Sequence, residues 1–151
     1  MMPDKSLILV WQVASLEARR ACAPSIGPRH FWLGLLKVCD ESFTFNLDKM
    51  EIDEEERESV LSTGRQVRKY LEMESESMTE VRHKLRSELG INPGQQILPA
   101  SKKSMHRSET MRLAFGKAQE IAAEQKTQCL TAFHLVVALF ELDLLDIKDC
   151  R

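Results

Sequence analysis

Apolar residues near the start of the chain recur at spacings of three and four positions, which is the period of one face of an α-helix. Between positions 5 and 22 they are Leu7, Val10, Trp11, Ala14, Ala18, Ala21 and Cys22. Asp4 has a side chain that can cap the first turn, and Pro24 cannot continue a helix. The pattern therefore predicts a helix over 5–22.

A second, more apolar segment follows a short connector. Pro28 suits the first helical position, because its missing N–H would have no partner there. Residues 30–38 are apolar on nearly every side, so a helix here belongs in the middle of a core. A buried strand is the competing interpretation. The second copy of this segment, described next, contains alanine and continues into Glu141, which favours a helix.

The chain contains an internal repeat with a constant offset of 104 positions. The first copy reads Leu7, Val10, Trp11, Ala14, Ala18, Ile26, His30, Leu33 and Leu35. The second copy reads Met111, Ala114, Phe115, Ala118, Ala122, Leu130, His134, Val137 and Leu139. Such a repeat determines the architecture, so we expect two related helical halves.

Two further helices are predicted between the copies. Asp53 and Glu56 fit a capping box that opens a helix through Leu71, and this explains the acidic stretch more simply than a patch for a basic partner. Ser77 and Glu80 fit a second capping box, for a helix that stops at Gly90. Residues 91–106 are rich in proline and polar side chains, which is typical of a linker. The added length in this region predicts an elongated third helix.

Composition narrows the possible partners. The 151 residues carry a net charge of −2, which is too small to attract nucleic acid or an acidic membrane. Lys102, Lys103 and Arg107 are dispersed and lack interleaved aromatic residues, so a phosphate or nucleic-acid contact is the weaker interpretation. No apolar run reaches the roughly 20 residues that a membrane helix needs. We expect neither nucleic acid nor membrane as a partner.

The four cysteines form no C-x-x-C pair, and three of them lie in or beside apolar segments. A free cysteine in such a segment behaves as a small hydrophobe. We therefore expect reduced thiols and a cytoplasmic protein.

No motif for catalysis is present. Walker A, H-E-x-x-H, G-x-S-x-G and G-x-G-x-x-G patterns are all missing. His30 and His134 could act as metal ligands, but neither has a carboxylate or thiol one turn away on the same face. A structural role for each, bonding a backbone carbonyl at its helix start, is the favoured interpretation. His83 and His106 lie in polar surroundings and should be solvated. We expect no catalytic residue, no metal and no cofactor.

The repeat unit resembles the N-terminal domain of Clp ATPases. The resemblance rests on an opening helix of the form AFGKAQEIA (114–122), and on the segments IGPRHFWLGLL (26–36) and LTAFHLVVALF (130–140). The family domain is a pseudo-twofold pair of four-helix repeats, and the resemblance covers most of 5–145. It implies a non-catalytic module that receives protein substrates and adaptor proteins, so the implied partners are these proteins or a Clp ATPase or protease.

The chain departs from the family pattern at the expected binding positions. Some members bind phosphorylated arginine through an acidic residue just before the motif histidine. Here Arg29 and Phe133 occupy those positions, and neither side chain accepts a guanidinium as a carboxylate does. Arg29 and Phe133 are therefore the candidate partner-binding residues by motif position. The alternative function is a stand-alone regulatory protein that keeps the fold without serving a Clp machine.

Together these observations predict an all-α fold with a pseudo-twofold duplicated helical repeat and about six or seven helices. We expect one domain over 1–151. Its first repeat covers about 5–90, the linker covers 91–106, and its second repeat covers about 107–151.

Overall fold

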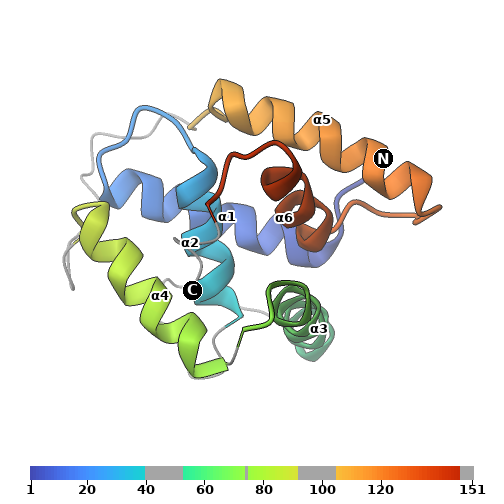
Figure 1. Ribbon diagram of the computed structural model, residues 1–151, viewed down its shortest axis with the longest axis horizontal. Coiled ribbons are helices and arrows are strands. Elements are labelled where there is room, and N and C mark those ends of the chain that lie inside the picture. Colours follow the sequence, from blue (N-terminus) through green and yellow to red (C-terminus); the bar gives the residue numbers. More distant parts are fainter. Residues whose placement is uncertain (40–52, 74, 92–104, 147–151) are drawn as a thin grey trace.

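A computed structural model describes residues 1–39, 53–73, 75–91 and 105–146 of the chain. The described residues form an all-α fold, as predicted (Figure 1). Its six helices are α1 (Lys5–Arg20), α2 (Pro28–Val38), α3 (Glu54–Leu71), α4 (Ser75–Glu88), α5 (Glu109–Glu124) and α6 (Ala132–Glu141).

Side-chain caps fix where several helices begin. The Asp4 carboxylate accepts a hydrogen bond from the Leu7 N–H at 2.9 Å, and the Ser108 hydroxyl accepts one from the Met111 N–H at 3.2 Å. Asp53 caps α3 in the same way. These bonds satisfy N–H groups that have no carbonyl partner in the first turn of a helix. The predicted cap of α1 is therefore confirmed, as is that of α3.

The first and fifth helices end in the same manner. Each is followed by a residue in the left-handed conformation, Cys22 (φ 56°) after α1 and Lys126 (φ 57°) after α5. The next N–H then bonds back across the turn, from Ala23 to the Ala18 carbonyl and from Thr127 to that of Ala122. Carbonyls left unpaired at the helix end are satisfied in this way. This turn ends α1 at Arg20, two residues before the predicted end.

The fourth helix differs from its prediction. It begins at Ser75, three residues before the start at Met78 that a cap at Ser77 would give, so the predicted start is wrong. The reason is the short connection, because α3 ends at Leu71 and left-handed Glu72 redirects the chain at once. The predicted stop at Gly90 is confirmed, with α4 ending at Glu88 and Gly90 in a positive-φ conformation.

Backbone hydrogen bonds join the start of each helix pair to the connector of the other pair. The Asp4 N–H donates to the Leu130 carbonyl at 2.9 Å, and the Ser108 N–H donates to the Ile26 carbonyl at 3.0 Å. Two more bonds complete these short bridges, from Leu130 N–H to Met2 O (2.9 Å) and from Ile26 N–H to His106 O (3.0 Å). The two bonds of each kind differ by the offset of 104 at every residue, which is consistent with the predicted duplication.

Close packing holds α1 against α2. A Cβ atom at Gly34 would lie 2.8 Å from the Ala14 nitrogen and 3.0 Å from the Val10 carbonyl oxygen. Only glycine permits two helix backbones to come so near. Between the two pairs, the rings of Trp11 on α1 and Phe115 on α5 meet edge to face with centroids 5.3 Å apart. The two positions that pack together are therefore also related by the repeat.

The remaining helices cover this central arrangement. In Figure 1, α5 runs along one edge of the molecule, and α6 lies between α5 and α3. The third helix packs on α1 and α6, whereas α4 packs on α2. No helix among the described residues is long and apolar enough to cross a membrane. The predicted linker lies mostly outside the described residues, which stop at 91 and resume at 105.

Candidate functional site

The two repeated histidines have the same structural role. The Gly27 N–H donates to His30 Nδ1 at 2.9 Å, and the Thr131 N–H donates to His134 Nδ1 at 3.0 Å. Each ring thus accepts from the residue before its helix, which is one half of a capping box. The structural role is confirmed, but the predicted bond to a backbone carbonyl is wrong. The partner of each Nδ1 atom is a backbone N–H at the helix start.

Both histidines are held in the neutral form. Burial lowers the pKa of His30, and the neighbouring Arg29 lowers it further while Glu17 opposes the shift. Burial likewise lowers the pKa of His134, against a smaller opposing effect of Asp4. A neutral ring keeps the lone pair on Nδ1 that the backbone bond requires. His83 and His106 are exposed, as expected.

Metal-binding and thiol chemistry receive no support from the described residues. They contain no group of three or more His, Cys, Asp and Glu side chains that could hold a metal ion. Cys22, Cys39 and Cys129 are free thiols, and Cys150 lies outside the described residues. Burial raises the pKa of Cys39 to about 12, so this thiol is protonated and unreactive. Cys22 and Cys129 are exposed, whereas Cys39 is buried.

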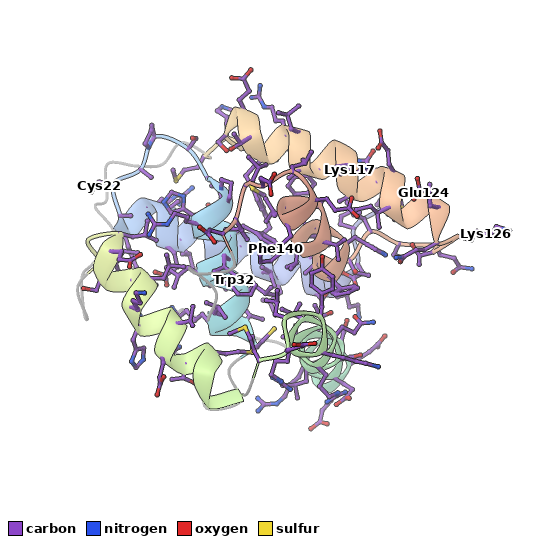
Figure 2. The ribbon with its side chains drawn as sticks, in the orientation of Figure 1. Cys22, Trp32, Lys117, Glu124, Lys126 and Phe140 are labelled. Carbon is purple, nitrogen blue, oxygen red and sulfur yellow. The ribbon has the colours of Figure 1, made fainter. Side chains whose placement is uncertain are left out.

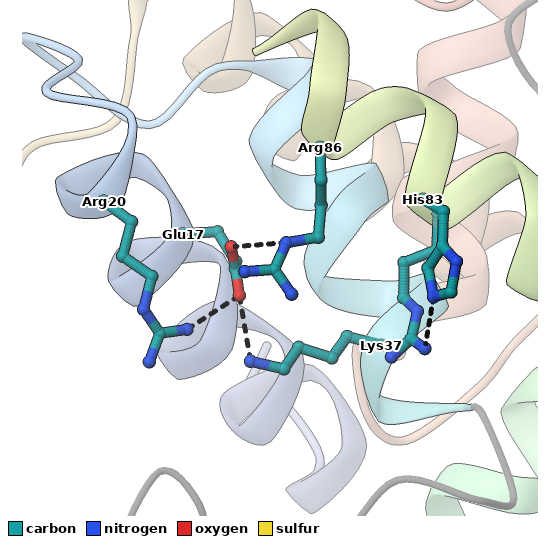
Figure 3. A network of polar contacts seen from close by, with 6 residues as sticks. Glu17, Arg20, Lys37, His83 and Arg86 are labelled. Carbon is teal, nitrogen blue, oxygen red and sulfur yellow. Dashed lines mark hydrogen bonds and ion pairs between the residues drawn. The ribbon is translucent and has the colours of Figure 1, made fainter. Parts of the chain in front are cut away.

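A buried carboxylate joins the first helix pair to α4 (Figure 3). Glu17 is completely buried, and its Oε1 accepts hydrogen bonds from Lys37 Nζ and from an Arg20 guanidinium nitrogen, each at 2.9 Å. Arg86 Nε of α4 lies 3.9 Å from Oε2. A buried charge persists only with such partners, because loss of its hydration is otherwise too costly. Sequence analysis missed this cluster, although Glu17 interrupts the apolar face between Ala14 and Ala18.

Arg29, the first candidate binding residue, contacts α4. Its guanidinium forms an ion pair with Glu88, and both side chains are about 40% exposed, at 43% and 40%. An ion pair so exposed contributes little to stability, about 0–1 kcal/mol. The pair nevertheless shows which side of α2 faces α4. Arg29 stays a prediction as a binding residue, and in this structure it is engaged within the chain.

Phe133, the second candidate, lies in an aromatic cluster on α6. The ring of Tyr70 on α3 meets Phe133 edge to face at 5.7 Å between centroids, and meets Phe140 at 6.2 Å. Val137 lies between the two phenylalanines on the same face of the helix, because positions four and three apart are neighbours there. We name Tyr70, Phe133, Val137 and Phe140 the Tyr70 face. Phe133, Val137 and Phe140 are half-buried, whereas 44% of Tyr70 is exposed.

Acidic side chains also gather where α6 meets α5. Lys117 Nζ lies 3.7 Å from a Glu141 carboxylate oxygen and 3.8 Å from one of Glu120. Glu124 follows one turn along α5, and Figure 2 shows that Lys117 and Glu124 both extend from α5. We call Lys117, Glu120, Glu124 and Glu141 the acidic edge. It carries three carboxylates for one ammonium.

The structure does not bring the two predicted residues together. Arg29 faces α4, and Phe133 faces α3. Sequence reasoning missed Tyr70, because its position beside the apolar stripe of α3 gives no signal for contact with α6. No protein-family model and no curated protein matches this chain.

Proposed function

We propose that this chain is a non-catalytic protein-binding module of the cytoplasm, similar to the N-terminal domain through which Clp ATPases receive protein substrates and adaptors. The observation that carries the proposal is the exchange of backbone bonds between two matched helix pairs. It gives the sequence repeat a physical counterpart at Asp4, Ile26, Ser108 and Leu130. The proposed partners are unfolded protein substrates, adaptors or a Clp ATPase or protease.

The chemistry of the site also favours binding over catalysis. Among the described residues Glu17 is the most buried charged group, and its ion pairs with Lys37 and Arg20 leave it unavailable to a substrate. By contrast, the Tyr70 face presents aromatic surface that is still accessible. Aromatic rings supply large contact area at a small cost in conformational entropy, which is why they are frequent at protein interfaces.

A binding measurement tests this proposal directly. The full chain is labelled with a fluorophore and titrated with the purified Clp ATPase of the same genome, and separately with a permanently unfolded protein. We expect saturable binding to at least one of them. A folded chain that binds neither would contradict the proposal, and folded bovine serum albumin serves as the non-binding control.

A second candidate is a regulatory protein that keeps the fold without serving a Clp machine. The ion pair of Arg29 with Glu88 favours it, because a motif position that faces a ligand in some family members is used here within the chain. A Clp gene beside this one, together with binding in the titration, would favour the first function. An isolated gene without such binding would favour the second.

A further inference from the structure

The fourth helix is attached to the rest of the molecule by a small apolar area. Among its described side chains, the buried apolar ones are Met78, Val81 and Leu85. They are spaced three and four positions apart and so form one narrow stripe. Among the described helices, α4 packs extensively only on α2, which itself buries every residue from Phe31 to Val38. The apolar contact that offsets the entropy cost of ordering α4 is therefore limited to this stripe.

The ion pairs between α4 and the first helix pair do not compensate for this small area. Arg86 Nε lies 3.9 Å from Glu17 Oε2, which is longer than a hydrogen bond. Glu88 pairs with Arg29, but the two side chains are 40% and 43% exposed, so water competes with the contact. Neither contact is both short and buried, so neither of them holds α4 firmly.

Three buried side-chain atoms without a hydrogen bond lie in or beside the part of the first helix pair that α4 contacts. They are Glu17 Oε2, Arg29 Nε and Trp32 Nε1. Glu17 and Arg29 are the residues that pair with α4, and Trp32 follows Arg29 by three positions, nearly one turn, on α2. No such atom occurs on α5 or α6, which the structure describes throughout. A buried polar atom without a partner is costly, so water that reaches these atoms when α4 lifts away favours the open form.

We propose that α4 is a releasable cover, which detaches from α1 and α2 while the two helix pairs stay folded. Segments that open alone in this way have few buried apolar contacts, as α4 does. In the closed form Glu88 holds Arg29, the candidate partner-binding residue, so α4 is autoinhibitory and its release frees Arg29 for a partner. This last step rests on the proposed function as a binding module. The open form is a minor population, so melting of the whole fold is still one transition.

Native-state hydrogen exchange of the full chain tests the release without any partner. The amides of α4 should exchange at least about tenfold faster than those of α1 and α6. Their rates should stay nearly constant in low urea, because opening of one helix exposes little surface, whereas rates that depend on global unfolding rise steeply. Equal rates and equal urea dependence in all helices would mean that α4 opens only with the whole fold, and would overturn the proposal. Exchange of α3 together with α4 would assign the motion to both helices and would also overturn release of α4 alone.

Matched variants separate release of α4 from global unfolding. Leu85→Ala removes part of the buried stripe and should speed exchange of α4 at least about tenfold. Lys84→Ala is the control, because Lys84 is exposed on the same helix, and it should leave the rate unchanged. Ser108→Ala weakens the start of α5, so it should speed the slowest amides of α1 about fivefold. It should leave α4 unchanged, because α5 is intact in both the closed and the open form, and an equal increase at α4 would overturn the proposal.

Binding to a partner tests the autoinhibition. The probe is the purified Clp ATPase of the same genome, with a permanently unfolded protein as the second probe. The apparent affinity is proportional to the population of the open form, so Leu85→Ala should bind about tenfold more tightly than Lys84→Ala. Equal affinity of the two variants would refute autoinhibition by α4. If no variant bound either probe while α4 exchanged as expected, the proposed function would be contradicted and release of α4 would stand.

Discussion

The first helix pair, α1 with α2, and the second, α5 with α6, have the same backbone plan but different interiors. Their helices begin at positions 104 apart, and α1 and α5 end in the same left-handed turn. In the first pair Glu17 is buried with Lys37, whereas the matched positions hold Ile121 and an exposed Glu141. The first pair is covered by α4, and it contacts α4 through the ion pairs of Glu17 with Arg86 and of Arg29 with Glu88. The second pair is apolar at that point and leaves aromatic rings accessible.

The largest effect is expected when Glu17 of the first pair is replaced by isoleucine, the residue that the second pair has at the matched position 121. Glu17→Ile leaves the buried ammonium of Lys37 without its carboxylate, so we expect a loss of about 3–5 kcal/mol in the free energy of unfolding. Adding Lys37→Met removes both charges and should recover most of that loss. Urea denaturation measures both variants. Equal stability of the single and double variants would show that the buried pair is not the important difference.

The next effect concerns the distance between the helices of each pair. Gly34→Ala introduces a methyl group against the backbone of Ala14, so we expect a loss of about 1–3 kcal/mol from overpacking. The matched residue is already alanine, and Ala138→Gly should cost about 1 kcal/mol through helix propensity. Thermal unfolding compares the two. An unchanged melting temperature of Gly34→Ala would show that α1 and α2 have room for a methyl group at this position, as α5 and α6 do.

A smaller effect depends on pH and involves both pairs. The pKa values of His30 and His134 are lowered in the folded state, so the unfolded chain binds more protons once the pH falls below about 6.5. The stability contributed by the neutral rings is therefore complete above that pH and is lost as the pH falls through the folded-state pKa values. Urea denaturation measures this loss of stability from pH 7.5 down to pH 4.5, a range of about 3 pH units.

Replacement by glutamine separates the two histidines. Glutamine at the third helical position retains the acceptor of a capping box but does not titrate in this range. His30→Gln and His134→Gln should each remove part of the pH dependence, because burial is the main cause that lowers both pKa values in the folded state. An unchanged pH profile in the double variant would assign the acid sensitivity to other groups.

The smallest effect is expected at the matched caps of α1 and α5. Asp4→Ala and Ser108→Ala each remove one hydrogen bond to an N–H of the first turn, at a cost of about 1 kcal/mol. Asp4→Ala should cost slightly more, because its carboxylate also accepts from the Ser6 hydroxyl and lies at the positive end of the helix. Thermal unfolding measures both, and Asp53→Ala is a control outside the repeat.

Local features of the fold could be predicted from the sequence, because caps and helical periodicity depend on residues within one or two turns. Asp4, Pro28 and Asp53 indicated helix starts that the structure has. The start of α4 could not be predicted in the same way, because the short connection after Leu71 decides it. The duplication stays a prediction from the repeat, and the exchanged backbone bonds are consistent with it.

The candidate site was less predictable, because contacts between helices depend on tertiary packing. The motif indicated Arg29 and Phe133, but their neighbours Glu88 and Tyr70 come from α4 and α3, for which the sequence gave only helical periodicity. Glu17 left a trace in the sequence as a charge on an apolar face. Its cationic partners, on three different helices, could be identified only in the structure.

The exchanged backbone bonds also constrain how the protein is made. The Asp4 N–H donates to the Leu130 carbonyl, so this bond cannot form during synthesis before Leu130 has left the ribosome. Closing such a distant contact costs loop entropy before it contributes stability, which slows folding. The start of each helix pair is bonded to the connector of the other pair. We therefore expect the described helices to be gained and lost in one cooperative transition, and neither pair to persist alone.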